Sequence, residues 1–136
     1  MPADPRSVVI RFNREVIEQG LAESLAALLA PDFVNHTAAP GMPSGPEGMR
    51  AMFEDILRPA LPDLRVEIHD QIVEGDKVVT RKTLRGTHRG ALLGVPATGR
   101  AIAIRVIDIV RVAGGRYAEH WGSNDLPAVL ASLRVS

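Results

Sequence analysis

The chain has 136 residues and no cysteine, and its sixteen basic residues balance its sixteen acidic ones, so its formal net charge is zero. The missing thiols exclude disulfides, cysteine nucleophiles and cysteine-ligated zinc or iron–sulfur sites. A chain without a basic excess has no electrostatic footprint for nucleic acid, so we expect no nucleic-acid partner.

Hydrophobic residues make up 46% of the chain and charged residues 24%, which is typical of an ordinary globular protein. The length fits one domain, expected over residues 1–136. No run of about 18 apolar residues is present, so we expect no membrane span. The segment 1–12 lacks the basic start and apolar run of a signal peptide. We therefore expect a cytoplasmic protein that does not bind membranes.

Helical patterns fill the first part of the chain. Apolar residues recur at helical spacing after Pro5, and Gly20 is expected to end that helix. A second, short helix is expected over residues 22–30, followed by a β-prone segment at 32–37.

A loop rich in proline and glycine is expected at residues 38–46. A third helix then runs to about Arg58, where Pro59 and Pro62 are expected to break it.

From Leu64 the apolar period changes from helical to alternating, which indicates strands. In the first strand, Ile72 has the same parity as Leu64, Val66 and Ile68 and is expected on the same face. Further strands are expected over residues 77–88, 101–112 and 116–123, and a short helix from residue 126.

Helices followed by an antiparallel meander predict an α+β fold. A curved sheet wrapped over the helices would enclose a cone-shaped pocket.

Asp108 is the most unusual residue of the strand 101–112, because it is the one carboxylate on a face with five aliphatic side chains. An acid in apolar surroundings must be paired, hydrogen-bonded or protonated. Asp108 is therefore either a general acid–base in a pocket or a structural partner of Arg81 or His120, and both roles can hold together.

His120 lies on the strand antiparallel to that of Asp108, and counting from the glycine turn at 114–115 places the two near the same rung. An Asp–His pair is the orienting pair of general-base chemistry. His120 shares its strand face with Gly122 and Asn124, while Trp121 has the opposite parity.

The remaining candidates carry weaker signals. His36 is expected to be a wall residue, and Arg81 is either part of an anion clamp or an exposed charge. His69 and His88 lie beside a turn and a loop, where we expect solvent. The four histidines lack metal-ligand spacing, and no glycine-rich phosphate loop is present, so we expect neither a metal nor a nucleotide cofactor.

Eight short motifs occur in an order that resembles the SnoaL-like polyketide cyclase (ester cyclase) family over nearly the whole chain. The motifs are Asp32-Phe-Val-Asn-His36, Gly45-Pro-Glu-Gly48, Leu61-Pro-Asp-Leu-Arg65, Val73-Glu-Gly-Asp76, Leu84-Arg-Gly-Thr-His88, Gly94-Val-Pro-Ala-Thr-Gly99, Ile107-Asp-Ile109 and Glu119-His-Trp121.

This resemblance implies a nuclear-transport-factor-2-like cone, in which a curved antiparallel sheet and helices enclose a pocket. It also implies a homodimer formed through the sheet. Family members close polyketide rings by intramolecular aldol condensation without a cofactor, and a pocket aspartate is their general acid–base. As aligned, that aspartate falls on Gly122, and its partner on the adjacent strand falls on Asp108.

Two hypotheses follow. In the first, the protein is a cofactor-independent enzyme for a small to medium apolar carbonyl compound, of cyclase or isomerase type. Asp108 then transfers protons with His120, while the side chains that shape, polarise or line the pocket are His36, Arg81, Trp121 and Asn124. In the second, the protein binds small hydrophobic molecules without catalysis, since Gly122 replaces the acid.

Overall fold

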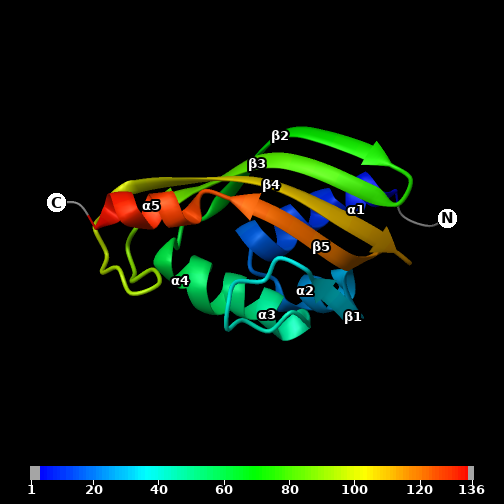
Figure 1. The fold of residues 1–136 in the computed structure, drawn as a ribbon, viewed down its shortest axis with the longest axis horizontal. Coiled ribbons are helices and arrows are strands. Elements are labelled where there is room, and N and C mark those ends of the chain that lie inside the picture. The colour runs from blue at the N-terminus through cyan, green and yellow to red at the C-terminus, as the bar shows by residue number, and fades with distance from the viewer. Residues whose placement is uncertain (1–3, 135–136) are drawn as a thin grey trace.

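The computed structural model describes residues 4–134, which form a curved sheet with helices packed against its concave face (Figure 1). The helices are α1 (Pro5–Arg11), η1 (Phe12–Glu18), α2 (Ala22–Leu28), α3 (Pro46–Arg50), η2 (Ala51–Leu57), α4 (Arg58–Ala60) and α5 (Leu126–Leu133). The strands are β1 (Leu29–Asn35), β2 (Arg65–Glu74), β3 (Lys77–Thr87), β4 (Ala101–Ala113) and β5 (Arg116–Asn124). The predicted α+β class is confirmed.

The helical segments follow the sequence pattern closely. The first helix ends where Gly20 adopts a φ of +68°, a conformation that favours glycine. Helix α1 continues into the wider, π-helical η1, and α3 continues in the same way through η2 into α4. The third helix runs to Ala60, slightly past its expected end at about Arg58. Pro59 lies in the final turn, so little of the helix follows the proline.

The sheet has the strand order β1-β5-β4-β3-β2. Strands β2 to β5 form the expected antiparallel meander. Strand β1 instead pairs parallel to β5, which makes the sheet mixed rather than wholly antiparallel. A long connection separates β1 from β5 along the chain, so no hairpin imposes an antiparallel direction on this pair.

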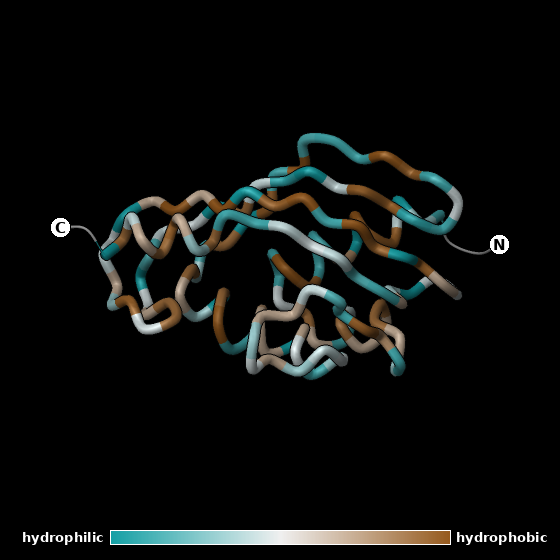
Figure 2. The backbone as a smooth tube through the Cα atoms, viewed as in Figure 1, coloured by the Kyte–Doolittle hydropathy of each residue, from teal (hydrophilic) through white to brown (hydrophobic). Residues whose placement is uncertain are grey.

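Hydrophobic and hydrophilic residues both occur along the strands (Figure 2). Their burial pattern separates a buried from an exposed face of the sheet. On β4 the even-numbered side chains are buried except Val106, which is half-buried, and most odd-numbered ones are exposed. The buried face packs on η1, where Phe12 stacks on Tyr117 with ring centroids 4.1 Å apart. This contact joins the helical layer to β5 at one end of the core.

Strand β2 departs from the predicted parity. A bulge between Ile68 and Asp70 shifts its register against β3. One extra residue reverses the facing of every later side chain. Ile72 therefore lies on the outer face and is 66% exposed, and the expectation that it shares a face with Val66 is wrong.

Candidate functional site

A cavity of about 670 Å³ lies between the inner face of the sheet and the helical layer. Its volume is in the range of small-molecule sites. Strands β3, β4 and β5, the segment after β1, helices α3, η2 and α5, and the loop before β4 all contribute side chains to its wall. Most of this wall is apolar, with the side chains Ile17, Met42, Met49, Met52, Phe53, Leu57, Leu84, Leu93, Ile104, Val106, Leu126 and Leu130.

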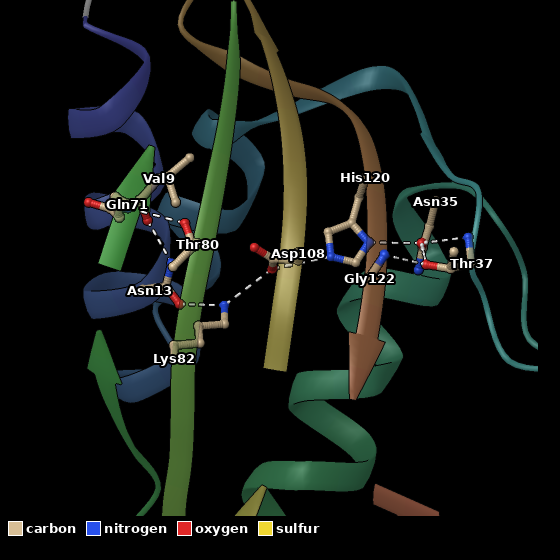
Figure 3. Close-up of polar contacts among 10 residues, drawn as sticks. All are labelled: Val9, Asn13, Asn35, Thr37, Gln71, Thr80, Lys82, Asp108, His120 and Gly122. Atoms are coloured by element: carbon tan, nitrogen blue, oxygen red, sulfur yellow. Dashed lines mark hydrogen bonds and ion pairs between the residues drawn. The ribbon is translucent and has the colours of Figure 1, made fainter. Parts of the chain in front are cut away.

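A row of polar side chains crosses three neighbouring strands at the cavity wall (Figure 3). Asp108 lies in the middle, on β4, and is 5% exposed. Its Oδ2 atom is 3.3 Å from His120 Nε2 on β5 and 3.4 Å from Lys82 Nζ on β3. Its Oδ1 atom is buried and has no hydrogen-bond partner within residues 4–134. Asp108 is thus held through one oxygen, while the other is enclosed with its capacity to accept a hydrogen bond unused.

The pKa of Asp108 reflects opposing influences. Burial raises it, but the charge of the neighbouring basic group at Lys82 and the hydrogen bond with His120 together outweigh burial. The net result is a pKa below the ordinary aspartate value. Asp108 is therefore a carboxylate at neutral pH, despite its apolar strand face.

His120 reaches Asp108 diagonally rather than from the same rung. The residue directly opposite Asp108 is Gly122, and His120 pairs with Val110. Counting from the turn placed His120 near the rung of Asp108, and the register shift between Arg111 and Val112 moves it one position further away. Diagonal cross-strand neighbours remain within reach of long side chains, so the two groups still meet.

Gly122 provides the room for this diagonal contact. A Cβ atom at position 122 would lie 2.8 Å from His120 Cε1, closer than real Cβ contacts allow. The imidazole therefore occupies the space beside Asp108 that any side chain at 122 would enter. The Gly122 backbone N–H donates to Thr37 Oγ1 at 2.8 Å, which ties β5 to the segment after β1.

Asn35 determines which ring nitrogen of His120 carries a proton. Asn35 Oδ1 accepts from the Thr37 backbone N–H at 3.2 Å, so this atom is the amide oxygen. His120 Nδ1 lies 2.9 Å from the same oxygen and must therefore donate to it. Nε2 is then the ring nitrogen that faces Asp108.

Lys82 and Asn13 belong to the same network, and neither was among the residues expected at the site. Lys82 is 4% exposed and lines the cavity, and its Nζ donates to Asn13 Oδ1 at 2.7 Å. Asn13 is held in turn by a bond from its Nδ2 to Val9 O at 2.8 Å. Lys82 lies between Thr80 and Leu84 on the buried face of β3, so the parity argument used for Asp108 was a signal for it too.

The other expected pocket residues divide into two groups. Asn124 lines the cavity, as do His120 and Gly122 on the same face of β5. His36, Arg81 and Trp121 lie instead on the outer side of the sheet. There the His36 and Trp121 rings stack at 4.8 Å, and Arg81 pairs with Asp70.

The reason for this placement is parity. Arg81 and Trp121 each have the opposite parity to a cavity residue next to them, and His36 follows Trp121 by stacking on it. His36 Nε2 also contacts Glu119 Oε1 at 2.9 Å. These three residues do not reach the cavity wall, so the expectation that they shape the pocket does not fit their position.

His88 is fully buried rather than solvated as expected. Its Nδ1 accepts from the Thr98 backbone N–H at 3.2 Å, and its backbone N–H donates to Arg100 O at 2.9 Å. These hydrogen bonds hold the two ends of the loop 88–100 together. Leu93 of this loop lines the cavity.

Residues 4–134 contain neither a cluster of metal-ligating side chains nor a membrane-spanning helix. No three histidine, aspartate or glutamate side chains of this part come together in a way that could hold a metal ion. None of its helices is long and apolar enough to cross a membrane.

Comparison with known proteins gives one family. The model of the SnoaL-like polyketide cyclase family matches residues 7–133. The aklanonic acid methyl ester cyclase DauD of Streptomyces sp. (strain C5) is 26% identical over 132 residues, which are 96% of this chain and 80% of DauD. DnrD of Streptomyces peucetius, another aklanonic acid methyl ester cyclase, is 26% identical over 93% of this chain and 86% of its own length.

Solved structures agree with the sequence relatives. IdmH from Streptomyces antibioticus is 34% identical and superposes with a TM-score of 0.83, covering 98% of this chain and all of its own. TsrD from Streptomyces laurentii is 31% identical with a TM-score of 0.83, covering 96% of this chain and 95% of its own. Both likenesses cover nearly the whole of this chain.

Proposed function

Because the chain belongs to the SnoaL-like polyketide cyclase family, we propose that it is a cofactor-independent enzyme acting on a small to medium apolar carbonyl compound of polyketide type. Asp108 and His120 move the protons. The single observation that carries this proposal is the contact of these two groups at the wall of a mostly apolar cavity, with Asp108 Oδ1 free of protein partners within residues 4–134.

The proposed reaction is an intramolecular aldol condensation. Asp108 removes a proton from the carbon next to a carbonyl group, and the resulting enolate carbon attacks a second carbonyl of the same molecule. The proton held between Asp108 and His120 is then passed to the new alkoxide. A carboxylate with a lowered pKa is a weak base, so this chemistry suits a hydrogen activated by two flanking carbonyl groups, as in a polyketide ester.

Substrate binding is assigned to the cavity wall. The apolar side chains there hold the body of the substrate, and Asn124 at the end of β5 contributes a polar group. Asn124 Oδ1 accepts from the Leu126 backbone N–H at 3.0 Å, and its amide NH₂, without a partner within residues 4–134, can donate to a ligand oxygen. We assign no substrate contact to His36, Arg81 or Trp121, since these lie on the outer side of the sheet.

A second candidate is a small-molecule-binding protein without catalysis. The observation in its favour is Gly122, which has no side chain where the family resemblance expects the acid. The two candidates separate in a thermal-shift screen coupled to product analysis. Hydrophobic carbonyl compounds that raise the Tm but are recovered unchanged support the binding protein.

We also propose that two copies associate through the outer face of the sheet and that the protein works in the cytoplasm. The outer face carries exposed aliphatic side chains, with Ile72 66% and Ile107 51% exposed. The formal net charge of zero lowers the repulsion between copies.

The assay that tests the catalytic proposal follows cyclisation of aklanonic acid methyl ester, the substrate in the names of two relatives. We expect turnover by the native chain and a loss of at least about a hundredfold in Asp108→Asn, which removes the base while keeping the shape. Asp70→Asn is the matched control, because Asp70 pairs with Arg81 on the outer face. Equal turnover by Asp108→Asn would remove Asp108 from the mechanism.

A further inference from the structure

Leu93 has a backbone conformation that is unfavourable for its residue type. Its φ is +46°, and every other residue with a positive φ within residues 4–134 is a glycine. In this left-handed region the Cβ of an L-residue lies too close to a backbone carbonyl oxygen, and glycine avoids the clash because it has no Cβ. Strain of this kind persists only where the surrounding structure holds it, and it clusters at ligand sites.

A tight turn with two buried ends holds this conformation. Leu92 and Val95 exchange backbone hydrogen bonds, both with N···O distances of 2.9 Å, and these residues are 0% and 3% exposed. Between them, Leu93 and Gly94 both have a positive φ, as in a type I′ turn. Asparagine followed by glycine suits such a turn best, so the turn itself does not account for a leucine at position 93.

The side chain of Leu93 is exposed as well as strained. It is 47% exposed and lines the cavity. An apolar side chain in contact with water loses free energy relative to a covered one. An apolar ligand in the cavity would cover Leu93, so the position that is unfavourable in the empty protein becomes favourable in the complex.

The loop 88–100 reaches the cavity from one end of the sheet. It connects the end of β3 to the start of β4 and lies beside α4, where the backbone N–H groups of Arg89 and Gly90 donate to Ala60 O (Figure 1). Asp108 lies near the middle of β4. Leu93 therefore meets a part of the ligand away from the group that reacts at Asp108.

We propose that Leu93 is a specificity-determining residue that contacts the apolar end of an elongated ligand whose carbonyl group lies at Asp108. The turn fixes the side chain before the ligand arrives, so binding requires little ordering of the loop. The ligand class is a carbonyl compound with an extended apolar substituent. This inference rests on the proposed function for the orientation of the ligand, but it concerns affinity and can be tested without turnover.

The test compares methyl acetoacetate with hexyl acetoacetate, which share the two carbonyl groups and differ in the length of the apolar ester. Isothermal titration calorimetry gives the dissociation constants. The native protein should bind the hexyl ester more tightly. Leu93→Ala should weaken hexyl binding at least about fivefold, because an apolar contact is lost, and should leave methyl binding unchanged. Leu21→Ala is the matched control, since Leu21 is 43% exposed but does not line the cavity.

Leu93→Gly separates ligand contact from fold stability. Glycine adopts the positive φ without strain, so the Tm of Leu93→Gly should exceed that of Leu93→Ala, while both variants bind the hexyl ester equally weakly. Native affinity for the hexyl ester in both variants, or an equal loss for the two esters, would overturn the proposal. So would a native protein that binds neither ester. Binding that depends on ester length and on Leu93, without exchange of the ligand's acidic hydrogens, would support this inference and contradict the proposed proton transfer.

Discussion

At the scale of single residues, the site depends on a side chain that is absent. Gly122 lies opposite Asp108, and the His120 ring fills the space beside it. A side chain at position 122 and the present contact between His120 and Asp108 therefore compete for the same space. That relation explains how a chain with glycine at 122 keeps a carboxylate and a proton donor at the cavity.

Gly122→Ala should displace His120 from Asp108 without unfolding the protein, because the new Cβ would lie 2.8 Å from the movable end of the ring. We expect turnover to fall about ten- to a hundredfold, as the proton donor leaves its position. In a double-mutant cycle, the alanine should have little further effect once His120→Ala is present. Additive losses in the double variant would contradict this account.

Sequence reasoning reached part of this site. Parity on β4 was sufficient to select Asp108, since one carboxylate among aliphatic side chains requires a partner. Lys82 breaks the buried face of β3 in the same way and could have been found by the same rule. Trp121 was expected at the pocket, although its parity is opposite to that of His120. Asn13 comes from η1 in the helical layer, and Asn35 comes from β1, which is distant from β5 in the sequence, so only tertiary packing brings them to the row.

At the scale of elements, long periodic segments could be predicted and irregularities could not. The helices and strands lie within a few residues of their expected bounds. The bulge in β2 and the register shift between β4 and β5 left no mark in the hydrophobic pattern, yet they moved Ile72 and the partner of His120. The parallel pairing of β1 with β5 joins distant segments, which local patterns do not encode.

The loop before α3 forms a wall of the cavity and depends on Gly48. A Cβ atom there would lie 2.0 Å from the carbonyl oxygen of Pro43, and backbone moves at higher cost than a side-chain end. Gly48→Ala should lower the free energy of unfolding by about 1–3 kcal/mol, measured by urea denaturation. Gly45→Ala is the matched control, because nothing lies within 4 Å of its added Cβ. An equal loss in both variants would contradict the tight contact.

Glu15 links the first two helices in a pH-dependent way. Hydrogen bonds from Arg11 and then Ser24 lower its pKa from 4.5 to about 2. A carboxylate whose pKa is lower in the folded than in the unfolded protein stabilises the fold at pH values above its unfolded pKa. This stabilisation is lost as the pH falls through the folded pKa. Between pH 4.5 and about 2, Glu15→Gln should therefore lose less stability than the native chain. The measurement is the free energy of unfolding of both proteins, obtained by denaturation at each pH. Equal changes with pH in the two proteins would contradict this link.

At the scale of the whole molecule, the two faces of the curved sheet carry different groups. The inner face holds the cavity and the polar row. The outer face holds ion pairs such as Arg81–Asp70 among exposed isoleucines. This division accounts for the outward position of His36, Arg81 and Trp121, which belong to the surface that we propose for dimer contact.

Ile107→Glu should weaken this association, because it places a charge in the centre of the exposed outer face. We expect the dimer dissociation constant to rise by about tenfold or more, measured by size-exclusion chromatography with light scattering. Ile10→Glu introduces the same charge on α1, where Ile10 is 38% exposed, and should leave the dimer intact. A monomeric native chain would contradict the proposed assembly.

The most direct measurement of the proposed proton transfer needs no knowledge of the natural substrate. Proton NMR in D₂O follows exchange of the hydrogens between the two carbonyl groups of a small apolar β-keto ester. We predict that the native protein and Asp70→Asn accelerate this exchange, and that Asp108→Asn slows it by at least about a hundredfold relative to them. Exchange by Asp108→Asn at the native rate would contradict the assignment of Asp108 as the base in the cavity.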